Sequence, residues 1–189
     1  MLTGLSNNER RYFLGISKGK IVYRPGKDAE PEYYDNFQGV VKSITKREAL
    51  INEKPMLYYD IQMTAGDLLY VLSVPLASSV ARSIILSLAN IENIKGAIIK
   101  ISPWKKDEYT NVSVYHKDQR VSWVVNGIPP LKEIIYKKTR ILDDTERVNL
   151  VDSYVTLINE RLHRQFNPET GELKAPEIPS DDDLPEDLG

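Results

Sequence analysis

The chain of 189 residues contains no cysteine and only two histidines, His116 and His163. Without cysteine it can form neither a disulfide nor a thiolate metal site, and with two histidines we do not expect a zinc or haem site. We therefore expect no metal and no cofactor. The sequence also lacks a run of about 18 apolar residues, so we expect no membrane-spanning helix.

Patterns that carry catalysis are absent as well. The sequence has no GxxxxGK[ST] phosphate loop, no other glycine-rich loop and no cluster of metal-ligating residues. It offers no nucleophile, base and orienting acid in a credible arrangement. We therefore expect a binding protein and not an enzyme. The opening residues, MLTGLSNNERR, lack the apolar stretch of a secretory signal, and a reducing cytoplasm is compatible with the missing cysteines.

Charge is distributed unevenly along the chain. Residues 167–189 contain eight acidic residues and one lysine, a net charge of −7; subtracting this from the −2 of the whole chain leaves +5 for residues 1–166. A basic body with an acidic tail is typical of many nucleic-acid-binding proteins, although +5 alone also lies within the normal scatter for proteins without such a partner. The tail contains four prolines and few aliphatic residues, so we expect it to be disordered.

The pattern most informative about function lies between Gly96 and Val125, where two runs alternate apolar residues with aromatic, polar or basic ones. Ile99 and Ile101 share one side of a pleated strand while Lys100 lies on the other. In the second run valines face the presumed core, and the opposite face carries Tyr109, Asn111, Ser113 and Tyr115. Residues 102–107 interrupt the pattern as an expected polar loop. A face that combines aromatic rings with lysines offers stacking surfaces for bases and cations for phosphates.

Four other segments complete the predicted order. A hairpin is expected over residues 11–24, then a strand over 34–51 with a bulge or a sharp bend at Gly39, and a further pair of strands over 55–74. A helix follows with Ser78 or Ser79 as its N-cap and ends near Asn93 to Gly96. Strand, strand, strand, helix, strand, strand is the order of the OB-fold, a five-stranded barrel that binds oligonucleotides. An open antiparallel sheet with one helix packed on it is the competing fold.

Within that barrel we expect the binding face on the second and third strands. The flanking loops would run over about residues 45–54 and 104–109. After the barrel, residues 131–141 are ambiguous between strand and helix. Asp143 or Asp144 can then cap a helix whose apolar stripe comprises Val148, Val151, Val155, Ile158, Leu162 and Phe166. This stripe packs either on the barrel of its own chain or in a dimer, which leaves a homo-oligomer open.

The predicted organisation is therefore mainly β, in four parts. These are an N-terminal hairpin and loop (1–30), an OB-fold domain (31–128), an extension with an amphipathic helix (129–166) and a disordered acidic tail (167–189).

Three stretches resemble the single-stranded DNA-binding proteins of tailed bacteriophages and, more distantly, those of bacteria. They are YFLGISKGKIV at 12–22, the pair IKISPW at 99–104 and NVSVY at 111–115 followed by VSW at 121–123, and DDDLP at 181–185. None is a specific motif by itself, but their order along one chain is more specific. The resemblance implies a cytoplasmic protein of an infected bacterium that binds single-stranded DNA during replication, recombination or repair.

The acidic end is similar to the tip through which bacterial members recruit partner proteins. Its candidate residues are Asp181, Asp182, Asp183, Leu184, Pro185, Glu186 and Asp187. The bacterial tip ends in a phenylalanine, whereas this chain ends in Leu188 and Gly189, so docking into the same partner pocket is not expected. The resemblance also implies that an acidic tail recruits replication or recombination proteins, or competes with DNA for the basic groove.

The candidate contacts to a nucleic-acid strand fall into two groups. The stacking candidates are Tyr58, Tyr70, Trp104, Tyr109, Tyr115 and Trp123, and the phosphate-binding candidates are Lys42, Lys46, Arg47, Lys100, Lys105, Lys106, Lys117 and Arg120. Tyr59 is omitted because alternation places it on the inner face. The rival interpretations are an RNA-binding OB protein, which would use the same side chains, and a protein–protein OB adaptor, which would use none of them.

Overall fold

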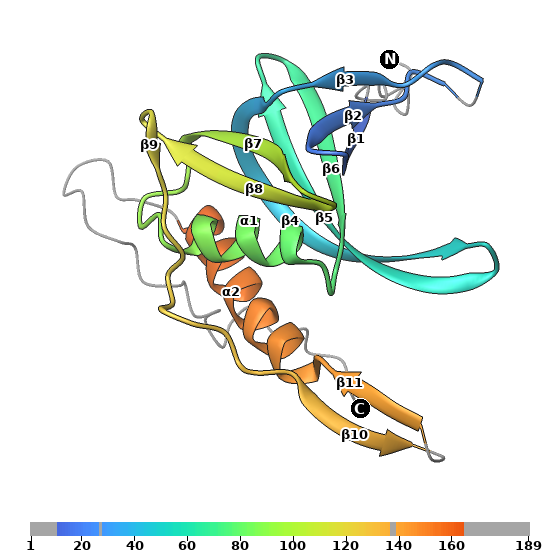
Figure 1. The fold of residues 1–189 in the computed structure, drawn as a ribbon. Helices are drawn as coiled ribbons and strands as arrows, with labels where there is room; N and C mark the ends of the chain where they lie inside the picture. The colour runs from blue at the N-terminus through green and yellow to red at the C-terminus, as the bar shows by residue number, and fades with distance from the viewer. Residues whose placement is uncertain (1–10, 27, 137–138, 165–189) are drawn as a thin grey trace, which may run out of the picture.

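The computed structural model describes residues 11–26, 28–136 and 139–164, which form a mainly β structure with two helices (Figure 1). Nine of the strands in these residues form one sheet in the order β3-β2-β1-β6-β5-β4-β7-β8-β9, and β10 and β11 form a separate hairpin. The elements are β1 (Arg11–Ser17), β2 (Lys20–Tyr23), β3 (Glu32–Tyr34), β4 (Phe37–Ile51), β5 (Lys54–Ala65), β6 (Leu68–Pro75), α1 (Ser79–Ala89), β7 (Ile98–Lys106), β8 (Tyr109–His116), β9 (Gln119–Arg120), β10 (Lys132–Tyr136), β11 (Thr139–Asp143) and α2 (Thr145–His163).

The predicted order of strands and helix over residues 34–116 is confirmed. β4, β5 and β6 form an antiparallel meander, α1 follows, and β7 returns to pair with the first residues of β4. The predicted closed barrel is wrong. The edge of β6 that would close it pairs instead with β1, in parallel, from Arg11↔Leu69 to Leu14↔Leu72, while β8 pairs with β9. The sheet is therefore open because the N-terminal hairpin occupies the edge of β6.

The turn of that hairpin touches the β7–β8 hairpin nonetheless. The backbone N–H of Gly19 donates to Thr110 Oγ1 at 3.2 Å. Gly19 has a φ of +73°, and a Cβ at this position would lie 2.6 Å from the backbone nitrogen of Lys105. Only glycine accommodates both the positive φ and so close an approach of two backbones. The sheet thus curls until β1–β2 meets β7–β8.

The bulge, one of the two alternatives expected at Gly39, lies elsewhere in β4. The register shift in β4 lies between Val41 and Ser43, two residues further on. A Cβ on Gly39 would lie 2.7 Å from the carbonyl oxygen of Thr64 on β5, so the glycine permits close approach of the two strands.

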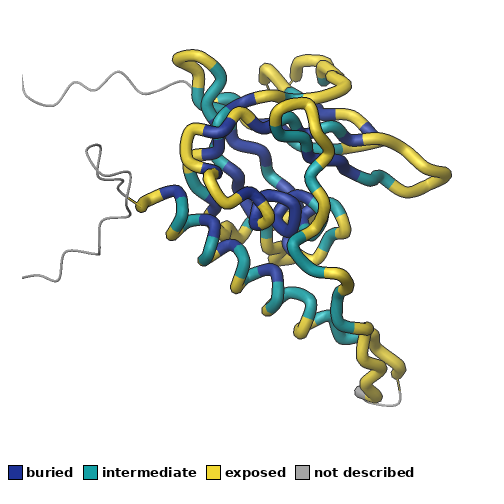
Figure 2. Tube along the Cα trace, turned by 90° about the vertical axis from the view of Figure 1, so that its left-hand side faces the viewer, coloured by how far each residue is buried: buried dark blue, intermediate teal, exposed yellow. Residues whose placement is uncertain are grey.

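The core lies between the inner face of the curled sheet and the two helices. We define the inner face as the one that carries Ile61 and Leu72, a directly opposed and fully buried pair. α1 begins at its N-cap Ser78, whose hydroxyl accepts from the N–H of Ala81 at 3.0 Å, and it buries Ile84, Ile85 and Leu88. It ends at Ala89, earlier than predicted. Figure 2 shows the buried positions gathered in the middle of the molecule.

α2 packs on this core by the predicted stripe. Val151, Val155, Ile158 and Leu162 are buried in the same cluster as α1 and the sheet, so this stripe is used within the chain and a dimer would need another surface. Asp144 occupies the N-cap position without a side-chain cap bond, while the Asp143 carboxylate accepts from the N–H of Thr145 at 3.0 Å. Phe166, the last predicted member of the stripe, lies outside the described residues.

Several segments expected as loops are strands. The connection predicted over 45–54 is the continuation of β4 into a two-residue turn at Asn52 and Glu53, both with positive φ, and β7 likewise continues to a turn at Asp107 and Glu108. The strand expected over 34–51 is divided, because Tyr34 ends the short strand β3 and β4 begins at Phe37. The segment 131–141, ambiguous in the sequence, contains β10 and the start of β11. Neither helix in the described ranges is long and apolar enough to cross a membrane.

Candidate nucleic-acid interface

The outer face of β7–β8 brings the largest group of predicted site residues together. Cross-strand pairing puts Lys100 opposite Tyr115, Trp104 opposite Asn111 and Lys106 opposite Tyr109. Ser102 and Ser113 form the remaining pair on this face. Alternate positions of the same strands, Ile99, Ile101, Val112 and Val114, are buried in the core. The predicted division into an apolar face and a polar aromatic face is therefore confirmed.

One row of this face extends over four strands. Gln38 on β4 is opposite Lys100, Lys100 is opposite Tyr115, and Tyr115 is opposite Arg120 on β9. The ammonium of Lys100 lies 5.0 Å from the centre of the Tyr115 ring, within the range of a cation–π contact. The row therefore alternates a ring with two cations across the sheet.

A groove of about 370 Å³ opens along the same row. Its lining comes from β4, from the start of β7 and from the β8–β9 turn: Gln38, Gly96, Ala97, Ile98, Lys100, Tyr115, His116, Lys117 and Asp118. Lys100, Tyr115 and Lys117 were predicted site residues. Gln38 was not, because only the pairing of β4 with β7 brings it to the groove. Ile98 was not a candidate either, because it is neither aromatic nor basic. The alternation that places the apolar Ile98 on the polar face was the one feature of the sequence that indicated a binding surface at the start of β7.

Trp104 and Tyr109 are the exposed rings at the far end of the face. Tyr109 is 76% exposed and Trp104 is 42% exposed, and the indole N–H of Trp104 donates to Ser113 Oγ at 3.2 Å. The prediction that Trp104 lies in a polar loop is wrong, since it lies within β7. The serine bond orients the indole on the outer face, and the strand backbone holds it at a defined spacing from Tyr115.

Six of the predicted cations form no ion pair within the described part of the chain. These are Lys42, Lys100, Lys105, Lys106, Lys117 and Arg120. The nearest carboxylates along the chain, Asp107, Glu108 and Asp118, lie in the two turns that bound the face and not in its strands. The cations of the face therefore form no ion pair with these carboxylates, although Asp118 lines the groove together with Lys100 and Lys117.

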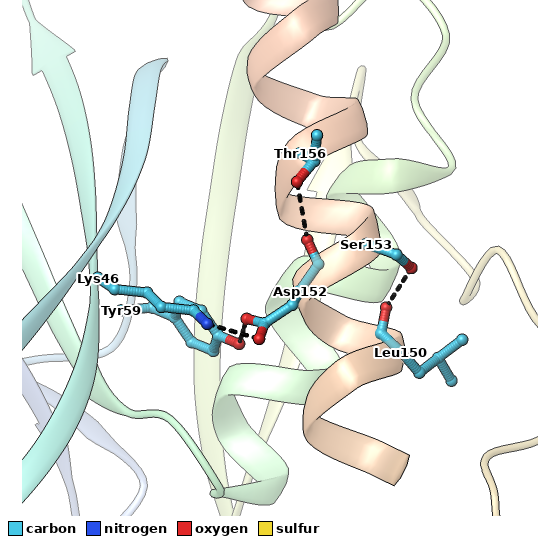
Figure 3. Close-up of polar contacts among 6 residues, drawn as sticks. All are labelled: Lys46, Tyr59, Leu150, Asp152, Ser153 and Thr156. Carbon is cyan, nitrogen blue, oxygen red and sulfur yellow. Dashed lines mark hydrogen bonds and ion pairs between the residues drawn. The ribbon is translucent and has the colours of Figure 1, made fainter. Parts of the chain in front are cut away.

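Lys46 points toward α2 (Figure 3), whereas the next residue of β4, Arg47, binds Asp60 on the other face of the sheet. Its ammonium and the hydroxyl of Tyr59 both bind the Asp152 carboxylate, each at 2.5 Å. Tyr59 is fully buried, as expected from alternation. Burial, followed by the hydrogen bond to Asp152, raises the pKa of the Tyr59 phenol well above its usual range, so this residue remains a neutral donor. Lys46 on β4 and Tyr59 on β5 thus both bind α2 through Asp152.

Arg47 and Tyr58 form a separate group on the outer face of the β4–β5 hairpin. The guanidinium of Arg47 binds the buried Asp60 carboxylate through Nε at 2.6 Å and lies 5.4 Å from the centre of the Tyr58 ring. Hydrogen bonding to Asp60 raises the pKa of Arg47. The Ser73 hydroxyl donates to the same carboxylate at 2.6 Å, so the buried Asp60 accepts hydrogen bonds from both Arg47 and Ser73.

The two remaining predicted rings lie elsewhere. Trp123 follows β9 on a segment bound to α1, where Val124 N–H donates to the Leu86 carbonyl at 3.0 Å and the Asn90 amide donates to the Ser122 carbonyl. Tyr70 is on the inner face, packed against Phe37 and Tyr12. The candidate tail residues 181–187 lie outside the described residues.

The described residues contain no group of three metal-ligating side chains. What the outer face of β7–β8 offers is a set of exposed rings and cations about 20 Å long, given four pairs at two-residue spacing. No protein-family model, curated protein or solved structure gives a significant match to this chain.

Proposed function

We propose that this protein binds single-stranded DNA without strong sequence preference, on the outer face of β7–β8. The observation that carries the proposal is the gathering of Trp104, Tyr109 and Tyr115 with cations that have no carboxylate partner in the described residues. Each ring face can stack on any base, which contributes about 1–3 kcal/mol per base, and the cations attract phosphates.

The order of strands supports an OB-like architecture for this function. The meander β4–β5–β6, the helix α1 and the return of β7 to β4 follow the OB order, with the closing pair of strands replaced by the N-terminal hairpin. The proposed role is protection of single strands in phage DNA replication, recombination or repair, in the cytoplasm of the infected host. In this proposal the acidic residues 181–187 recruit partner proteins or compete with the strand for the basic face.

The test is to replace rings on this face and measure binding. Trp104→Ala and Tyr109→Ala should each weaken binding of fluorescent oligo-dT by roughly 5- to 150-fold, which corresponds to about 1–3 kcal/mol of lost stacking. Both rings are exposed, so the melting temperature should change little. Fluorescence anisotropy measures the affinity.

The matched control is Phe13→Ala, which removes an exposed ring from the outer face of β1, outside the interface. It should leave the affinity unchanged. Duplex of equal length should compete weakly because paired bases hide their faces, and RNA of the same sequence separates a DNA-binding from an RNA-binding protein. If oligo-dT does not bind even after removal of residues 181–189, the proposal fails and a protein–protein adaptor becomes the better interpretation.

A further inference from the structure

The inner face holds a pocket that the β7–β8 interface does not use. Its volume is about 270 Å³, and five aromatic side chains line it: Tyr12, Tyr23, Tyr34, Phe37 and Tyr70. It lies where the N-terminal hairpin completes the sheet, because Tyr12 is opposite Tyr70 across the parallel β1–β6 pair. Tyr70 is in turn opposite the buried Met63, which places these rings on the core side.

The rings form a continuous wall. The centres of Tyr12 and Tyr70 are 5.2 Å apart, those of Phe37 and Tyr70 are 4.8 Å apart, and those of Tyr12 and Tyr23 are 5.8 Å apart, all in tilted arrangements. All four of these rings line the pocket. Tyr34, 47% exposed on the edge strand β3, lies at the rim.

The lining is entirely uncharged. Leu14 and Ile21, both buried, supply an apolar surface, while Asn36 and the tyrosine hydroxyls supply hydrogen-bond donors and acceptors. A phosphate or carboxylate would find no cation among the lining side chains. A neutral planar heterocycle fits this set, since it needs apolar ring contacts and a few hydrogen bonds at its edge.

The pocket is also connected to the proposed interface. Ile21 is two residues from Gly19, whose backbone N–H donates to Thr110 Oγ1 on β8 and at which an added Cβ would lie 2.6 Å from the backbone nitrogen of Lys105. A nucleic-acid strand that passes the tip of the β7–β8 hairpin therefore also reaches the β1–β2 hairpin, which forms part of the pocket wall.

We propose that this pocket takes one unstacked nucleobase of the bound strand. The inference rests on the proposed function, and it adds a site on the inner face for a single neutral base, distinct from the outer stacking surface. Tyr34 is its rim contact. The hydroxyl of Tyr34 donates to the Glu32 carboxylate, so the contact offered to a base is the ring and not the hydroxyl.

The chain provides a matched pair of variants. Tyr33 and Tyr34 are adjacent on β3 and both exposed, at 53% and 47%, but in a strand their side chains point to opposite faces and only Tyr34 lines the pocket. Full-length wild type, Tyr34→Ala, Tyr34→Phe and Tyr33→Ala should be titrated with labelled oligo-dT and with an oligomer of abasic residues of the same length. Thermal melting checks that each variant is folded.

We expect Tyr34→Ala to weaken oligo-dT binding by roughly 5- to 150-fold and abasic binding hardly at all, as one lost base contact predicts. Tyr34→Phe should keep wild-type affinity, and Tyr33→Ala should behave as wild type on both ligands. If wild type binds oligo-dT and Trp104→Ala weakens it while Tyr34→Ala equals Tyr33→Ala, the pocket proposal is overturned and the proposed function stands. If wild type does not bind oligo-dT, the proposed function itself fails. Thymidine bound at Tyr34 in the absence of strand binding would overturn the strand-base assignment in favour of a free-nucleoside site.

Discussion

A single asparagine side chain replaces a missing strand along β4. β7 pairs with β4 only over residues 37–40, so the same edge of β4 is not paired with β7 at Ile44. There the Asn159 amide accepts from the Ile44 N–H at 3.0 Å and donates to the Ile44 carbonyl at 2.8 Å. The side-chain amide thus satisfies both backbone groups of one residue, as a neighbouring strand would.

Asn159→Ala should therefore destabilise the protein by about 1–3 kcal/mol, because it leaves two partly buried backbone groups without their partner. Urea unfolding measures the change in the free energy of unfolding. Asn149→Ala, at an exposed position of the same helix, should change it by less than about 0.5 kcal/mol. Equal effects of the two variants would show that the Asn159 pair contributes nothing beyond helix propensity.

For single residues, the alternation of apolar and polar positions predicted which face of the sheet a side chain occupies, but not the residue to which it binds. It correctly placed Tyr59 inside and Tyr109 and Tyr115 outside. It treated Lys46 and Arg47 alike, although they point to opposite faces and bind different carboxylates. Asp152, the partner of Lys46, is more than one hundred residues away in sequence, and no local pattern indicates such a pairing.

The N-terminal hairpin is the element whose placement matters most to the interface. Its turn depends on Gly19, which combines a positive φ with close backbone contact to β7. Gly19→Ala should cost about 1–3 kcal/mol in the free energy of unfolding, because the added Cβ meets a backbone atom that cannot move aside cheaply.

Gly15→Ala is the control in the same hairpin, since a Cβ there meets nothing within 4 Å and its φ is not positive. It should be within about 0.5 kcal/mol of wild type. Chemical denaturation of the two variants gives the comparison, and an unperturbed Gly19→Ala protein would mean that the hairpin turn is not held against β7 in solution.

Elements with strong local patterns were predictable, and the connections between distant edges were not. The meander, α1 and the β7–β8 pair follow from period-two and helical spacing of apolar residues. The pairing of β1 with β6 is parallel and joins segments far apart in the sequence, so nothing in either strand indicates it. The tight turns at Asn52–Glu53 and Asp107–Glu108 lack the Asn-Gly or Asp-Gly signature, which is why loops were expected there.

For the whole molecule, charge determines how binding responds to salt. Six predicted cations have no ion pair in the described residues, so the log–log slope of affinity against salt should be no steeper than about −4 on single strands, at roughly −0.7 per neutralised phosphate. Lys100→Ala should flatten this slope by about 0.7. Lys46→Gln should leave it unchanged, because its ammonium is bound to Asp152. Anisotropy titrations over a salt series give the slopes, and equal flattening by both variants would contradict the assignment of the interface.

The parallel contact of β1 with β6 has a consequence for the growing chain. Leu69 is synthesised 58 residues after its partner Arg11, and the same interval separates Leu14 from Leu72. At about 5–20 residues per second, β1 waits roughly 3–12 s for the strand on which it docks. During that interval a two-stranded hairpin has only marginal stability and keeps Leu14 and Ile21 in water. The β1–β2 hairpin is therefore synthesised before β6 but can dock only after β6 has been made. A chaperone that shields nascent chains would meet this hairpin before it meets β6.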